Sequence, residues 1–152
     1  MNYMGQIILM AVLLLCSALF SGSETAYFKI SPRLRRKFKE SDTKLHQTIA
    51  ELISNPHQLL TSLLFGNMAV NVLYFALASV LSIKLQQTNS TTSALISAAA
   101  AFFTLLLFGE MLPKSLAYYH SETACVVTAP FCLVTTRVLS PLIKIFERFI
   151  IT

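Results

Sequence analysis

A single carboxylate, Glu110, stands at the end of an apolar segment that begins at Leu85 and contains no other charged residue. An ionisable side chain costs roughly 3 kcal/mol at the centre of a membrane span, so a glutamate in such a segment indicates a functional site. Pro113 follows three residues later. Because proline has no N–H, the carbonyl of Gly109 loses its helical partner. The carboxylate and this carbonyl predict a site lined by oxygen atoms that would bind a hard cation.

Polar side chains in two other apolar segments could supply further oxygen atoms. Asn67 and Asn71 are four residues apart, and therefore on one face of a helix, with Gly66 beside them. An unpaired amide is costly in lipid, so both should point into a helix bundle. The polar residues of the first apolar segment are Ser17, Ser21, Ser23, Glu24 and Thr25.

Hydroxyl, carboxamide, carboxylate and backbone carbonyl oxygens are the ligands that Mg²⁺ and Ca²⁺ take in proteins. No histidine or cysteine joins them, which argues against zinc, copper or iron. The three cysteines are predicted to be small apolar packing residues: Cys16, Cys125 and Cys132. Two alternatives stay open. The asparagines and serines could simply hydrogen-bond between helices, and Glu110 could be a neutral buried acid or the ion-pair partner of Lys114.

The elements that must position these residues follow from composition. The 152 residues are 55% hydrophobic and only 12% charged, whereas a soluble domain is about 25% charged. Three segments each have more than 20 residues without a charge, and about 20 residues span the hydrocarbon core. The sequence therefore predicts an all-α membrane protein with transmembrane helices at about 3–28, 58–83 and 90–115.

The distribution of positive charge predicts the topology. Seven of the twelve basic residues lie between the first two spans: Lys29, Arg33, Arg35, Arg36, Lys37, Lys39 and Lys44. By the positive-inside rule this connection is cytoplasmic, so we expect the N-terminus outside and the C-terminus inside the cell (inner or plasma) membrane. Nucleic-acid binding is the competing interpretation. A basic cluster beside a span favours lipid contact instead, and no nucleic-acid partner is expected.

Two juxtamembrane regions flank the spans. Ser31 and Pro32 predict a helix start, followed by an amphipathic helix over about 32–54 that lies against the inner leaflet. In the last third, 123–136 is apolar for only 14 residues, which is more typical of an interfacial or re-entrant segment than of a span. With a further amphipathic helix over 142–151, it predicts a second juxtamembrane region over about 121–151. A fourth full span is the alternative that stays open.

Three motifs in the chain are similar to those of a known family. The sequences FSGSETA (20–26), GNMAVN (66–71) and FGEMLPK (108–114) lie at a similar predicted depth, toward the inner side. Together they resemble the transmembrane domain of the cyclin M (CNNM)/CorC family of Mg²⁺ transporters. The resemblance implies a homodimer of three-span protomers, each holding a dehydrated Mg²⁺ in an inward-facing cavity. It also implies export of Mg²⁺ in exchange for Na⁺.

The resemblance assigns the metal ligands residue by residue. They are Ser21, Ser23, Gly66, Asn67, Asn71, Gly109 and Glu110. Members of the family usually continue into a pair of cytoplasmic CBS domains. Thr152 ends this chain where that region would begin, so we expect the CBS pair to be absent here and to be a partner only in a longer form. Membrane lipids and a second copy of the chain are the other expected partners.

Two other functional classes compete with transport. A Mg²⁺-sensing membrane scaffold would bind the ion and regulate partners without carrying flux. An enzyme would need Ser21 or Ser23 as a nucleophile and one of the histidines as a base. No nucleophile elbow or triad motif places them together, so enzymatic activity is not expected. The histidines are His46, His57 and His120.

Overall fold

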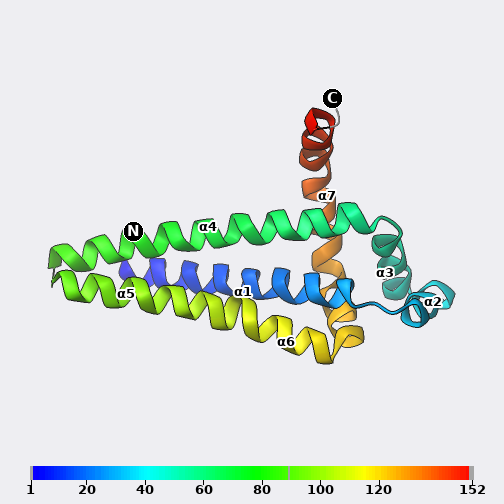
Figure 1. Ribbon diagram of the computed structural model, residues 1–152, viewed down its shortest axis with the longest axis horizontal. Helices are drawn as coiled ribbons and strands as arrows, with labels where there is room; N and C mark the ends of the chain where they lie inside the picture. The colour runs from blue at the N-terminus through cyan, green and yellow to red at the C-terminus, as the bar shows by residue number, and fades with distance from the viewer. Residues whose placement is uncertain (1, 89, 151–152) are drawn as a thin grey trace.

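The computed structural model describes residues 2–88 and 90–150, which are almost entirely helical and contain no strand. These described residues form seven α-helices and one π-helical stretch (Figure 1): α1 (Tyr3–Phe28), α2 (Pro32–Glu40), α3 (Lys44–Ser54), α4 (Pro56–Thr88), α5 (Thr91–Thr104), η1 (Leu105–Met111), α6 (Leu112–Tyr119) and α7 (Ser121–Ile150).

Three long rods lie side by side: α1, α4, and a third rod that runs through α5, η1 and α6. At the end of the bundle far from the α4–α5 connection, α2 and α3 pack beside α7, which crosses the rods at a steep angle (Figure 1). Four described helices are long and apolar enough to span a membrane: Tyr3–Phe28, Pro56–Thr88, Thr91–Tyr119 and Ser121–Ile150. Length and composition thus admit a fourth span where the sequence predicts three.

The first juxtamembrane region begins where the sequence predicts, but it is not one continuous helix. The hydroxyl of Ser31 accepts a hydrogen bond from the backbone N–H of Leu34 at 3.2 Å and caps α2. The single helix predicted over 32–54 is wrong, because α2 and α3 are separated around Ser41. Its hydroxyl accepts from the backbone N–H of Thr43 at 3.4 Å, a local bond that competes with helical pairing.

The last third also differs from the prediction. A short apolar segment over 123–136 and a separate helix over 142–151 were expected. Instead α7 is one continuous helix that contains both Pro130 and Pro141. Both prolines lie on exposed positions of the helix, so their rings do not disturb its packed face.

The buried core forms where α7 crosses the bundle. Phe38 of α2, Ile49 of α3 and Leu63 of α4 are fully buried there, together with Cys125 and Cys132 of α7. Both of these cysteines are free thiols, as expected for small packing residues. This crossing therefore ties α2 and α3 to the ends of the rods that lie far from the α4–α5 connection (Figure 1).

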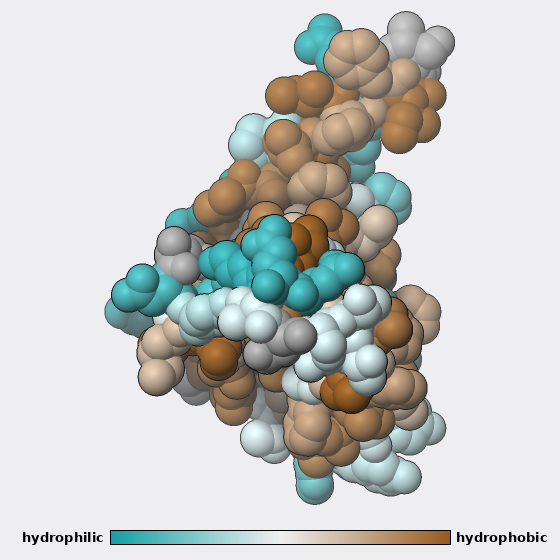
Figure 2. All heavy atoms as spheres, turned by 90° about the vertical axis from the view of Figure 1, so that its left-hand side faces the viewer, coloured by the Kyte–Doolittle hydropathy of each residue, from teal (hydrophilic) through white to brown (hydrophobic). Residues whose placement is uncertain are grey.

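The surface of the bundle is apolar along its sides and polar at the end where α4 joins α5 (Figure 2). Figure 2 looks onto the end where α4 joins α5, and hydrophilic residues gather on it, Gln86, Gln87 and Thr88 among those exposed there. Along the rods, large apolar side chains are exposed, such as Met68 at 67% and Ile96 at 65%. Exposed apolar area of this extent marks a surface that contacts lipid or another protein chain.

The third rod is continuous through its proline. The sequence predicts a turn broken by Pro113, but the chain stays helical and widens into the π-helix η1 just before it. The backbone N–H of Leu112 donates to the carbonyl of Leu107, five residues back. Single π-helical turns inside α-helices occur frequently at functional sites, and η1 carries both Gly109 and Glu110.

Candidate cation site

Ser17 of α1 is the centre of a polar cluster between the three rods. Its side chain is fully buried. Its Oγ lies 2.8 Å from Asn71 Oδ1 and 3.3 Å from Asn67 Oδ1, both on α4. It also lies 3.4 Å from the carbonyl oxygen of Gly109 in η1. Three elements that are far apart in the sequence thus contribute oxygens to one point.

The oxygens that converge on the Ser17 hydroxyl outnumber the hydrogens that it can donate. A serine hydroxyl carries one hydrogen, so it cannot satisfy the oxygens of Asn67, Asn71 and Gly109 together. Converging oxygens with surplus lone pairs create a negative potential, and burial strengthens it. Such an arrangement favours the binding of a small cation by these oxygens.

Glu110 adds the formal charge. Its Oε1 accepts a hydrogen bond from the amide nitrogen of Asn71 at 2.8 Å. Asn71 therefore links the carboxylate to Ser17, with its oxygen facing the hydroxyl and its nitrogen facing the carboxylate. Among the described residues, no basic side chain lies within ion-pairing distance of Glu110. A carboxylate inside a bundle without a cationic partner favours the binding of a cation.

Lys114 has a different partner from the one the sequence left open. Its Nζ lies 3.9 Å from a carboxylate oxygen of Glu24 on α1. This pair joins α1 to α6, beyond the polar cluster. The alternative that Lys114 neutralises Glu110 is therefore not what the structure shows.

The two predicted serines of α1 differ in their surroundings. Ser21 is fully buried, one helical turn from Ser17, and its hydroxyl has no hydrogen-bond partner among the residues that the structure describes. An orphaned buried hydroxyl calls for a missing partner, such as an ion or water. The hydroxyl of Ser23 instead donates to the carbonyl of Leu19 in its own helix at 2.6 Å. The structure thus does not bring Ser23 to the cluster.

The two glycines of the predicted ligand set both allow close packing. A Cβ on Gly109 would lie 3.1 Å from Ser17 Oγ and 3.0 Å from Leu105 Cδ1, so a side chain there would press into the cluster. A Cβ on Gly66 would lie 2.4 Å from the ring of Phe20. The side of Gly66 that a Cβ would occupy is therefore filled by the Phe20 ring.

The sequence prediction omits Ser17 from the ligand set, although Ser17 makes more contacts in the cluster than either predicted serine. The sequence indicates Ser17 only weakly, through its position four residues before Ser21 on the same helical face. Within residues 2–88 and 90–150, no three His, Cys, Asp or Glu side chains gather as a metal site. The cluster is a site of neutral oxygens with one carboxylate.

A family model agrees with the resemblance that rests on the motifs at 20–26, 66–71 and 108–114. The family model described as "Cyclin M transmembrane N-terminal domain" matches residues 8–151. The chain belongs to this family. With its long apolar helices, the cyclin M domain is a multi-pass membrane domain.

Two curated relatives contain a region similar to this cyclin M domain. A UPF0053 protein of Haemophilus influenzae is 29% identical over 142 residues, which are 93% of this chain and 33% of the relative. The UPF0053 inner membrane protein YfjD of Escherichia coli is 29% identical over 106 residues, 70% of this chain and 24% of the relative. The chain thus spans about a third or less of the length of these relatives.

Proposed function

We propose that this cyclin M domain transports Mg²⁺ across the inner or plasma membrane, exporting it in exchange for Na⁺. The observation that carries the proposal is the convergence of the Asn67, Asn71 and Gly109 oxygens on Ser17, with Glu110 adjacent. Family membership supports the choice of Mg²⁺ over other hard cations.

The ligands of the proposed Mg²⁺ are Glu110, Gly109, both asparagines, Ser17 and Ser21. Mg²⁺ prefers six oxygens in an octahedron and gives up its water reluctantly, so several neutral oxygens must replace that water. A single carboxylate leaves the loaded site with about one positive charge, which favours release. Two further assignments rest on the family resemblance, namely Ser23 and Gly66.

The proposed topology places the N-terminus outside and α2, α3 and α7 at the cytoplasmic surface. The basic residues of the 29–44 region lie at the same end of the bundle as α7 (Figure 1), as the positive-inside rule requires of a cytoplasmic end. The site then lies on the inner half of the membrane. A homodimer, and CBS domains in a longer form, remain proposals from the resemblance.

The charge of Glu110 provides the test. Glu110→Gln keeps the side-chain size but removes the only carboxylate of the cluster, so Mg²⁺ binding and Mg²⁺ flux into liposomes should fall at least about tenfold. Glu24→Gln is the matched control, because Glu24 is also a half-buried carboxylate near the inner end but pairs with Lys114. It should keep the wild-type affinity.

Full flux by the Glu110→Gln protein would overturn the proposal. The competing sensor function makes a different prediction for the wild-type protein, namely Mg²⁺ binding without flux in the same liposomes. Measuring binding by titration calorimetry and flux on one preparation separates the two.

A further inference from the structure

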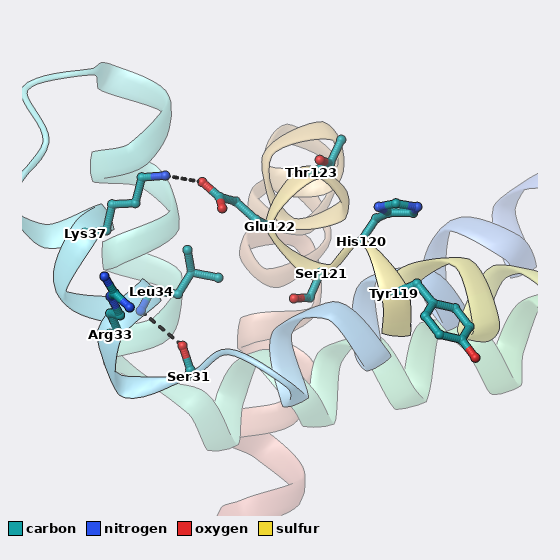
Figure 3. Close-up of a pocket in the computed structure, with 9 residues that line it drawn as sticks. All are labelled: Ser31, Arg33, Leu34, Lys37, Tyr119, His120, Ser121, Glu122 and Thr123. Carbon is teal, nitrogen blue, oxygen red and sulfur yellow. Dashed lines mark hydrogen bonds and ion pairs between the residues drawn. The ribbon is translucent and has the colours of Figure 1, made fainter.

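A hollow opens between α2 and the start of α7 (Figure 3). It lies at the end of the bundle away from the α4–α5 connection (Figure 1). Its volume is about 740 Å³, within the range of small-molecule sites in proteins. The lining residues are Ser31, Arg33, Leu34, Lys37 and the segment 119–123. None of them belongs to the cation site.

The charges around the hollow favour an anion. Arg33 and Lys37 are four residues apart on α2 and both line it, and Figure 3 shows Lys37 facing Glu122 of α7 across the hollow. That ion pair neutralises one of the two cations. Among the described residues, the guanidinium of Arg33 has no carboxylate or other hydrogen-bond partner. A planar guanidinium that is free to form two parallel hydrogen bonds suits a phosphate group.

The surroundings of the hollow indicate where the phosphate comes from. Tyr119 lines it and is 76% exposed, and Leu116, one turn earlier on α6, is 63% exposed. These residues end the apolar third rod, so they mark the level at which hydrocarbon gives way to headgroups in the proposed topology. Tyrosine is enriched at that level of membrane proteins. A free anion would gain nothing from these apolar neighbours, whereas a phospholipid could lay its acyl chains along them.

We propose that this hollow binds the phosphate of an anionic phospholipid headgroup, with Arg33 as its principal contact. The lipid would lie between α2 and α7, and would hold both helices at the inner surface of the membrane. The chemical group recognised is the phosphate of a headgroup that carries no cation of its own, and the membrane is its source. The proposal does not depend on transport by the cation site.

The other basic residues of α2 offer a matched comparison. Arg36 is exposed on the same helix and lies beside Arg35 and Lys39, around a different hollow. Arg33→Ala and Arg36→Ala therefore remove the same charge from the same helix. General attraction to an anionic surface would weaken equally in both variants, whereas a site between α2 and α7 would be lost only in the first.

The experiment measures lipid retained by the full chain in detergent by native mass spectrometry, with phosphatidylglycerol or phosphatidylcholine added. The wild-type and Arg36→Ala proteins should retain phosphatidylglycerol over phosphatidylcholine, and Arg33→Ala should bind phosphatidylglycerol about tenfold more weakly. Equal loss in the two arginine variants would overturn the site. Inorganic phosphate that displaces phosphatidylglycerol at millimolar concentration would overturn the assignment to a lipid. Since Arg33 is exposed, its replacement should leave the fold and Mg²⁺ binding intact.

Discussion

Ser17 and Ser23 are both fully buried serines of α1, yet their hydroxyls face different partners. The Ser17 hydroxyl lies among the Asn67, Asn71 and Gly109 oxygens, whereas that of Ser23 is bonded to its own helix. Ser17→Ala should weaken Mg²⁺ binding about tenfold, or about 1.4 kcal/mol, because the site loses a ligand. Ser23→Ala should bind within about threefold of wild type. Titration calorimetry measures both.

The opposite order would contradict a site centred on Ser17. If Ser23→Ala binds Mg²⁺ more weakly than Ser17→Ala, the ligand assignment from the family motif is the correct one. If both variants bind Mg²⁺ with wild-type affinity, neither Ser17 nor Ser23 is a ligand. Ser62→Ala serves as a folding control, because that buried hydroxyl is also bonded within its own helix.

Much of the cluster could be predicted from residue chemistry, but its centre could not. Asn67, Asn71 and Glu110 are conspicuous because polar groups are rare in apolar segments. Ser17 is a small residue in an apolar run, and serines are common at helix contacts in membranes. Only the rotation of α1 against α4 makes Ser17 central, and that rotation is set by tertiary packing.

At the scale of the helices, the missing side chain of Gly66 allows α1 to pack closely against α4. The ring of Phe20 occupies the space where a Cβ of Gly66 would lie, and the same ring packs edge-on against Phe131 of α7 at 4.8 Å between ring centroids. Gly66→Ala should therefore destabilise the protein by about 1–3 kcal/mol, as overpacking does. A lower midpoint of thermal unfolding in detergent would show this.

Gly22→Ala is the matched control for this helix contact. A Cβ on Gly22 would come no closer than 3.7 Å to Pro113, which is an ordinary contact. Alanine is also the better helix former by about 1 kcal/mol, so this variant should unfold at the same or a higher temperature. A fall in the midpoint as large as that of Gly66→Ala would show that the contact of Phe20 with Gly66 is not the cause.

The helices themselves were predicted unevenly, for a physical reason. The bounds of α1 follow from its apolar length, and the start of α2 follows from Ser31 and Pro32. The π-helical stretch before Pro113 has no pattern in the sequence, since it depends on how the rod adapts to the lost N–H. The continuity of α7 through Pro130 and Pro141 also depends on packing against the bundle.

At the scale of the whole molecule, the angle of α7 to the three rods indicates whether α7 spans the membrane or lies on its surface. Its composition allows it to span, but it crosses the three rods at a steep angle (Figure 1). If α1 and α4 span the bilayer, α7 must then lie along its surface. Its buried positions agree with this arrangement, because Cys125, Ala129 and Cys132 share one face against the bundle.

A cysteine scan distinguishes the two orientations of α7. In a background with Cys16, Cys125 and Cys132 replaced by alanine, single cysteines along α7 would be labelled with a water-soluble maleimide in membranes open on both sides. A surface helix should label with a period of about 3.6 residues over its whole length, and a spanning helix should show a protected block of about 20 residues. The same scan along α4 supplies the protected block as a reference. A block of that length in α7 would establish a fourth span and contradict the surface position of α7 that the proposed lipid site requires.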